Sequence, residues 1–182
     1  YNALFANVGA QNAAVGSNAL SSNTTGNLNT ALGYESLYSN TTGSYNARFG
    51  STTLRNNTTG TRNIAIGSDA SANNTIGGYN VSMGVAALRD NVAGSGSIAI
   101  GYQSMLFANE ASSAFTPANT AIGFESLMGS STPENNTGTK NTAIGYQSMK
   151  NNTSGRDNTA TGYTALLANT TGLSNTAYGA FS

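Results

Sequence analysis

The chain of 182 residues contains no cysteine, no histidine and no tryptophan. Without cysteine it forms no disulfides and no thiolate metal sites. Without histidine it lacks the commonest metal ligand and the usual general base. Only 8% of the residues are charged and the formal net charge is zero, whereas about 25% of residues are charged in a typical soluble domain. The sequence therefore predicts no basic surface for nucleic acid and no acidic tail.

Long apolar runs are also missing, since no stretch approaches the roughly 18 residues that a membrane span requires. No signal peptide is recognisable. We therefore expect no direct membrane insertion of this segment. The chain begins at Tyr1, at the sixth position of the repeat described next, and ends at Ser182, at the eighth. Because both ends fall inside a repeat, we expect residues 1–182 to be an internal fragment of a longer protein.

The chain does contain a repeated sequence motif. Its most complete copy is at residues 141–146, which read Asn-Thr-Ala-Ile-Gly-Tyr. Its copies start at residues 12, 29, 46, 63, 80, 97, 119, 141, 158 and 175. Successive copies are 17 residues apart, except for two intervals of 22 residues after residues 97 and 119. A fixed period of this kind indicates one structural unit that stacks on itself.

The repeat has a regular internal pattern. Position one is Asn in nine copies, position three is Ala in eight, and position five is Gly in all ten. Positions two to four alternate over a short β-branched run, which predicts a strand. We expect positions two and four to face a core and position three to face the other way. The glycine fits a corner, and the Asn-Thr-Thr-Gly that follows position nine is typical of a turn.

This pattern predicts an all-β fold, a parallel β-roll (β-solenoid) of about ten 17-residue coils, each built from strand, corner, short strand and turn. Helical repeats of two helices need roughly 30 to 47 residues, so they fit poorly. We expect the large apolar residues at positions four and nine to be buried. Two such residues per coil contribute too little to order one coil alone, because ordering the backbone costs about 1–2 kcal/mol per residue. We therefore expect the coils to stack, with the asparagines at position one forming a side-chain ladder.

The thin core also predicts a second buried surface, shared between chains in a closed homo-oligomer, most simply a homotrimer. The small residues at position three are the candidates for that surface. Arg48 interrupts them, and three guanidinium groups meeting at an axis would require an anion, water or a carboxylate partner. The predicted trimer-axis residues are Ala31, Arg48, Ala65, Ala99, Ala121, Ala143 and Ala160.

Residues 97–104 read Ser-Ile-Ala-Ile-Gly-Tyr-Gln-Ser and residues 141–148 read Asn-Thr-Ala-Ile-Gly-Tyr-Gln-Ser. Both resemble the S-V-A-I-G-x-x-S repeat of YadA-like trimeric autotransporter heads. The longer motif, in which this repeat is followed by an Asn-Thr-Thr-Gly turn, is similar to repeats of bacterial surface proteins and phage-type tail fibres. The resemblance covers essentially the whole chain. It implies a left-handed parallel β-roll of three chains around one axis, on a cell surface or a virion. The 17-residue period and Arg48 depart from the head pattern.

Two coils carry about five extra residues each, one set near 108–118 and the other at 130–134, each containing a proline. Both follow position nine, so they are expected at the outer turn of the coil. Loops that project from a rigid scaffold often carry binding function. The alternative is that these are tolerated insertions without a role of their own.

Little in the sequence points to catalysis. The seven acidic residues are scattered along the repeat, so a close carboxylate pair for glycoside hydrolysis is not expected. Serine and threonine are abundant but no histidine accompanies them as a base. Clustered carboxylates for calcium are not evident either. We predict a protein that is not an enzyme and that uses no cofactor and no metal; a fibre-borne glycan depolymerase is the catalytic alternative.

Aromatic residues recur at position six, and the last four of them are expected to form a column because coils stack. The column is either a platform for sugar rings, since aromatic rings supply area and a polar handle, or a ladder that covers the corner. The candidate ligand-binding residues are the aromatic residues Tyr34, Tyr102, Phe124, Tyr146 and Tyr163.

Threonines at positions thirteen and fourteen suggest ice binding, but they belong to turns rather than to a flat strand face.

Taken together, these features predict a structural and adhesive segment of an extracellular protein, a trimeric β-roll rod that acts as spacer and multivalent binding surface. Host-surface glycans or protein receptors are the expected ligands. The alternative is a phage or injection-system tail fibre that recognises carbohydrate. The depolymerase and ice-binding interpretations remain further alternatives.

Overall fold

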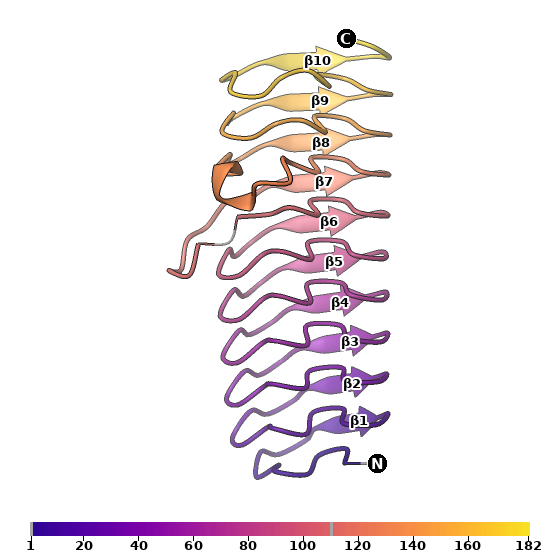
Figure 1. Ribbon diagram of the computed structural model, residues 1–182, viewed down its shortest axis with the longest axis vertical. Coiled ribbons are helices and arrows are strands. Elements are labelled where there is room, and N and C mark those ends of the chain that lie inside the picture. The colour runs from indigo at the N-terminus through magenta and orange to yellow at the C-terminus, as the bar shows by residue number, and fades with distance from the viewer. Residues whose placement is uncertain (1, 110) are drawn as a thin grey trace.

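The computed structural model describes residues 2–109 and 111–182 as a straight stack of coils (Figure 1). Each strand pairs in parallel with the strand of the next coil, and the ten strands follow one another in sequence order in a single sheet. The predicted all-β parallel β-solenoid with coils of about 17 residues is confirmed. The strands are β1 (Ala13–Val15), β2 (Thr30–Leu32), β3 (Ala47–Phe49), β4 (Ile64–Ile66), β5 (Val81–Met83), β6 (Ile98–Ile100), β7 (Thr120–Ile122), β8 (Thr142–Ile144), β9 (Thr159–Thr161) and β10 (Thr176–Tyr178).

Each strand is followed directly by the glycine of position five, which forms the predicted corner. Gly123, for example, has φ +137°, a conformation that residues with a Cβ rarely adopt. Its Cα also lies against the carbonyl of Gly145 in the next coil, so a Cβ there would collide with backbone. Glycine is therefore required twice, once by the bend and once by the close stacking of the coils.

The short second strand predicted after the corner is absent from the described coils, where turns take its place. Positions seven and nine have left-handed backbone, as in Glu125 (φ 51°) and Leu127 (φ 46°). The N–H of Glu125 donates to Tyr102 O of the preceding coil, and the N–H of Leu127 donates to Ser148 O of the following coil, both at 2.9 Å. The alternating backbone thus points successive N–H groups up and down the stack, and these inter-coil bonds offset the cost of left-handed conformation.

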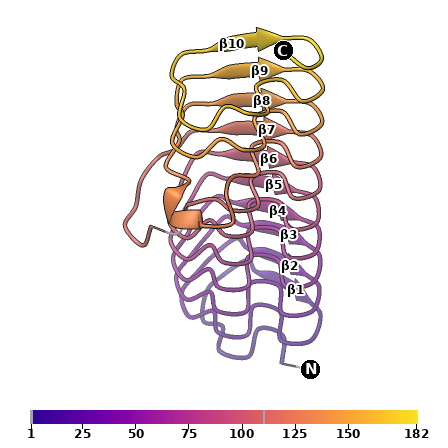
Figure 2. The same cartoon turned by 45° about the horizontal axis from the view of Figure 1, so that its top comes forward.

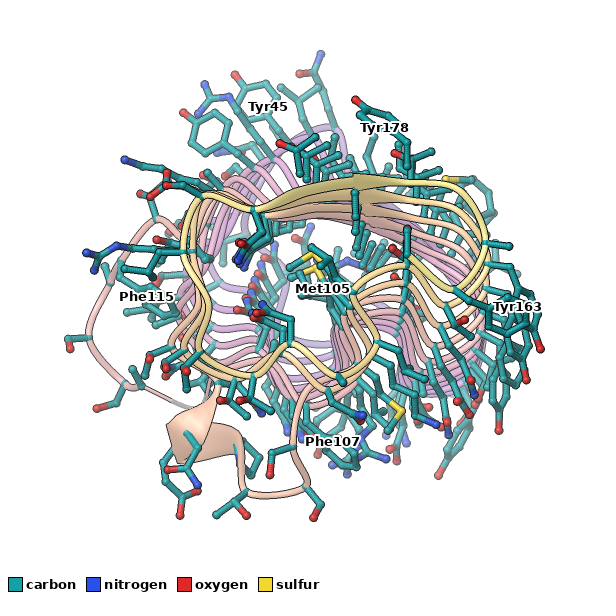
Figure 3. The ribbon with its side chains drawn as sticks, turned by 90° about the horizontal axis from the view of Figure 1, so that it is seen from above. Tyr45, Met105, Phe107, Phe115, Tyr163 and Tyr178 are labelled. Carbon is teal, nitrogen blue, oxygen red and sulfur yellow. The ribbon has the colours of Figure 1, made fainter. Side chains whose placement is uncertain are left out.

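The interior of each coil is filled from two walls. Alanine at position three points inward from the strand, and the large residue at position nine points inward from the opposite wall, as Ala121 and Met149 do in one continuous cluster. Met105 lies at the centre of the coil in the view along the stack (Figure 3). The prediction for position nine is confirmed, but the directions predicted for positions two to four are wrong. Alternation tells which residues share a side of a strand, and not which side is the core.

Two ladders of asparagine side chains run through the same interior. At position one, Asn46 Nδ2 donates to Asn29 Oδ1 of the preceding coil at 3.0 Å, which confirms the predicted ladder. The second ladder, at position twelve, was not predicted. There, Asn57 Nδ2 donates both to Asn40 Oδ1 at 2.9 Å and to Gly60 O at 3.1 Å. Each amide therefore satisfies its own turn and joins it to the next coil.

The two insertions leave the stack on the same side (Figures 1 and 2). One connects β6 to β7, and its residue 110 lies outside the described residues. The other connects β7 to β8 and contains the 3₁₀ helix η1, Pro133–Asn135. No helix in the described part of the chain is long and apolar enough to cross a membrane.

Candidate functional site

The aromatic residues of position six form the predicted column, hereafter the aromatic column. The rings of Tyr102, Phe124, Tyr146 and Tyr163 stack in sequence, with centroids 5.1, 5.2 and 5.0 Å apart and planes within 16° of parallel. They are 40–48% exposed. Tyr34 stands apart from the column, because its neighbours at position six are serines.

Stacking determines what the column presents to a ligand. Each inner ring has both faces covered by its neighbours, so solvent reaches mainly the ring edges. A sugar packs on the face of an aromatic ring, and the faces of Phe124 and Tyr146 are occupied. The geometry supports the ladder interpretation, in which aromatic contacts join successive coils at the corner. Tyr163 additionally meets Phe181 edge to face, at 5.3 Å.

Among the described side chains, two ion pairs join successive coils, and one of them lies beside the aromatic column. Lys150 Nζ lies 2.6 Å from Glu125 Oε2, and Gln147 Nε2 donates to the same oxygen at 2.8 Å. The hydrogen bond from Lys150 and that from Gln147 lower the pKa of Glu125 below its usual value near 4.5. An equivalent pair joins Arg55 to Glu35 at 2.7 Å. Within the described residues, no three acidic side chains gather as a metal site would require.

The prediction that position three faces a trimer axis is wrong. These side chains enter the coil's own interior, where the core is built, and cannot reach a neighbouring chain. No accessible surface in the single chain is left on any of the predicted axis residues, which are Ala31, Arg48, Ala65, Ala99, Ala121, Ala143 and Ala160.

Arg48 is the exception among these small residues. Its guanidinium lies inside the coil, and none of its three nitrogens has a hydrogen-bond partner among the described residues. Burial away from water lowers the pKa of Arg48 well below its usual value. In strand register Arg48 lies between Ala31 and Ala65, so a long cation occupies a place that alanine fills in the coils on either side. The suggested meeting of three guanidinium groups at an axis does not apply.

The surface that sequence reasoning missed is the outer face of the ten-stranded sheet, hereafter the apolar sheet face. It consists of the side chains at positions two and four of β1 to β10, none of which is charged. The alternating pattern could have indicated it, had the inward side been assigned correctly. Its exposed large side chains are Val15, Phe49, Ile64, Met83, Ile98, Ile122, Ile144 and Tyr178.

A small cavity lies beneath the insertions, where the ladder at position twelve stops at Asn91 and resumes at Asn152. It measures about 30 Å³, and Asn119, Phe115 and Leu127 also line it. A water needs about 10–15 Å³ by this measure, so the cavity has room for two or three at most. The two coils that lack a ladder asparagine therefore leave a gap that the inserted residues largely fill.

The threonines of position thirteen are engaged within the rod. Thr24 Oγ1 donates to Thr41 O at 2.9 Å, Thr58 Oγ1 donates to Thr75 O at 3.2 Å, and Thr153 Oγ1 donates to Thr170 O at 3.0 Å. A hydroxyl proton used in this way is not available to order water on the surface. These contacts support a structural role for the Asn-Thr-Thr-Gly turns.

Comparison with known proteins gave no match to any family model, any curated protein or any solved structure.

Proposed function

We propose that this chain is a structural and adhesive rod, a spacer segment of an extracellular surface protein or fibre. Three copies associate through the apolar sheet face in a left-handed, homotrimeric β-roll. The observation that carries the proposal is that face itself. It runs the length of the ten strands, bears no charge, and leaves side chains such as Ile98, Ile122 and Ile144 exposed in the single chain.

The size of the face supports association. Ten strands about 4.8 Å apart and three residues wide give a surface of about 45 by 10 Å, or about 450 Å². Fourteen of its twenty side chains are apolar or aromatic and six are threonines, so about two thirds of this area, or about 300 Å², is apolar. Apolar patches of about 300–600 Å² on a monomer are often functional. The face lies along one side of a straight rod (Figure 1), so a rotation axis parallel to the rod brings equivalent faces together along their whole length. Such closed cyclic symmetry is the usual form of a homo-oligomer.

The test is the mass of the assembly in solution, measured by sedimentation equilibrium. The wild-type chain is expected as a trimer. Ile122→Asp places a carboxylate in the middle of the apolar sheet face and is expected to give monomers. Ile76→Asp is the matched control, because Ile76 is equally exposed (37%, as for Ile122) but belongs to a turn outside the sheet. A wild-type chain that stays monomeric at high concentration contradicts the proposal.

Adhesion follows from repetition along and around the rod. Three equal copies would present three sets of each exposed column, and weak contacts gain avidity through effective concentration. Ligand binding by Tyr34, Tyr102, Phe124, Tyr146 and Tyr163 stays a prediction. If these residues bind glycans, replacing Tyr102, Phe124 and Tyr146 by alanine should abolish binding of the protein to a glycan array. Retained binding in that variant would leave the column a purely structural ladder.

The same array addresses the tail-fibre alternative, which predicts carbohydrate recognition by the intact chain. A depolymerase would shorten the polysaccharide, which size-exclusion chromatography of the glycan detects.

A further inference from the structure

Two tyrosines of the aromatic column are direct neighbours. The rings of Tyr146 and Tyr163 lie 5.0 Å apart with planes 6° from parallel, and both side chains are at least 40% exposed. Every other tyrosine pair in a described column has a different side chain between its members. Phe124 separates Tyr102 from Tyr146, and Arg62 lies between Tyr45 and Tyr79, 5.1 and 5.3 Å from their centroids.

We propose that Tyr146 and Tyr163 form an oxidative cross-linking site at which the phenol rings of neighbouring coils are joined as dityrosine. A haem peroxidase with hydrogen peroxide removes one electron and one proton from each phenol. The two phenoxyl radicals couple through the ring carbons next to the phenol oxygens, and a carbon–carbon bond forms. The two electrons and two protons taken from the phenols reduce one hydrogen peroxide to two waters. The hydrogens on the coupled ring carbons then move to the phenol oxygens, which restores both aromatic rings, so the joined product is lighter by two hydrogens in total.

The fold holds the reacting groups together before the reaction. β8 and β9 pair in register, with Thr142 opposite Thr159 and Ile144 opposite Thr161. Both tyrosines follow the corner glycine by one residue, so the two rings stack at the same corner of successive coils (Figure 3, where Tyr163 is labelled on the outside of the coil). Holding two reactants in this way turns an encounter between separate groups into an intramolecular step.

A dityrosine bond would give the chain a covalent cross-link between coils. The chain has no cysteine, so disulfides cannot staple its coils. A bond between Tyr146 and Tyr163 closes a loop of one coil and restricts the unfolded chain, which stabilises the folded state. The thermal midpoint of the cross-linked protein is therefore expected to rise by several degrees relative to the untreated protein.

The experiment treats the dilute purified chain with peroxidase and hydrogen peroxide and maps tryptic peptides by mass spectrometry. Trypsin cuts after Lys140, Lys150 and Arg156, so Tyr146 and Tyr163 leave in separate peptides, 141–150 and 157–182. The expected product is these two peptides covalently joined and lighter by two hydrogens, with dityrosine fluorescence in the intact chain.

Matched variants make the result specific. Tyr163→Phe keeps the stacked ring and removes the phenol, so the joined peptide is expected to disappear. Tyr102→Phe keeps the joined peptide, because Tyr102 has Phe124 as its neighbour. Phe124→Tyr is expected to add a second link through position 124. The proposal is overturned by the absence of the joined peptide in the wild-type chain, or by its persistence in Tyr163→Phe, which would place the reaction at Tyr178. Links found only between molecules overturn it as well.

Discussion

At the residue scale, Arg48 differs from the equivalent residue of every other coil, because it is a long charged side chain at a position that is otherwise small. Position three accepts alanine or serine in the other nine copies, since the opposite wall supplies a leucine or methionine in every coil that has a position nine except the one with Ser71. A charged guanidinium enclosed there gives up its hydration and receives no hydrogen bond from the described residues. Leaving a buried charge without a partner costs several kcal/mol, so the sequence carries a local defect in an otherwise uniform core.

Replacing that residue is therefore expected to stabilise the protein. Arg48→Ala restores the side chain of eight other coils and should raise the free energy of unfolding by roughly 1–4 kcal/mol. Urea denaturation followed by circular dichroism measures the change. The reciprocal variant Ala99→Arg should destabilise by a similar amount. An Arg48→Ala protein that is less stable than wild type would mean that the guanidinium has a partner.

Glu125 gives a second prediction at this scale, on pH. The hydrogen bonds from Lys150 and Gln147 hold its folded pKa below the usual value near 4.5. A lowered carboxyl pKa contributes stability that is present above the unfolded pKa and is lost as the pH falls through the folded pKa. The Glu125→Gln variant should therefore melt below wild type at pH 7, and the difference should shrink below about pH 4.

Differential scanning calorimetry at pH 7 and pH 3 provides the measurement. Glu134→Gln is the control, because Glu134 lies exposed in η1 and no ion pair to it occurs in the described part of the chain. An equal Glu125→Gln difference at both pH values would show that the ion pair contributes nothing to stability.

At the scale of the element, the coil is set by its corner. The strand is only three residues long, and the glycine after it turns the chain with a backbone that other residues avoid. The same glycine lies against the corner of the next coil, so the corners determine how closely the coils stack. Left-handed residues at positions seven and nine then complete the coil and direct its backbone hydrogen bonds along the rod.

Gly123→Ala tests the corner. Backbone strain alone should cost about 1–3 kcal/mol, and the collision of the new Cβ with the Gly145 carbonyl adds to it. Gly96→Ala is the contrasting variant. Gly96 also has positive φ (+73°), but the nearest atom to an added Cβ is Thr116 Cγ2 at 3.5 Å, and Tyr79 adopts a similar φ of 59° at the same repeat position. Chemical denaturation should find a smaller loss for Gly96→Ala, about 1–2 kcal/mol from left-handed backbone alone without a collision, and equal losses for the two variants would contradict the argument.

At the scale of the whole molecule, the rod is one-dimensional, because each strand contacts only the strands of the adjacent coils. The stability of such an array is approximately a sum of coil terms and neighbour terms. A defect therefore weakens its own neighbourhood more than distant coils. Association through the apolar sheet face would change this behaviour, since every coil would then also contact other chains.

Leu37→Ala tests this locality. Leu37 is fully buried in a cluster with Leu20 and Ala31, and its truncation should cost about 2–5 kcal/mol. Hydrogen exchange should lose protection in β1 to β3 while β8 and β9 stay protected. Leu173→Ala, at an exposed site, is the control. Uniform loss of protection along the chain would mean that the rod unfolds as a single cooperative unit.

The sequence by itself determined the repeat, and the repeat determined most of the fold. The period, the glycine in every copy and the β-branched run predicted coils, corners and strands, and the asparagine of position one predicted a ladder. These signals are local, since each depends on what a residue does to its own backbone or to the identical residue in the next coil. The aromatic column follows for the same reason, because stacked coils place Tyr146 directly beside Tyr163.

Only the tertiary structure decided which side of the strand is the inside. Ala121 and Ile122 alternate in either arrangement, and the choice depends on whether the opposite wall supplies the bulk that fills the coil. Leu127 and its equivalents supply it, so alanine faces inward and isoleucine faces outward. The burial of Arg48 and the apolar sheet face both follow from that choice. Neither could be read from a pattern that specifies a period and leaves the direction open.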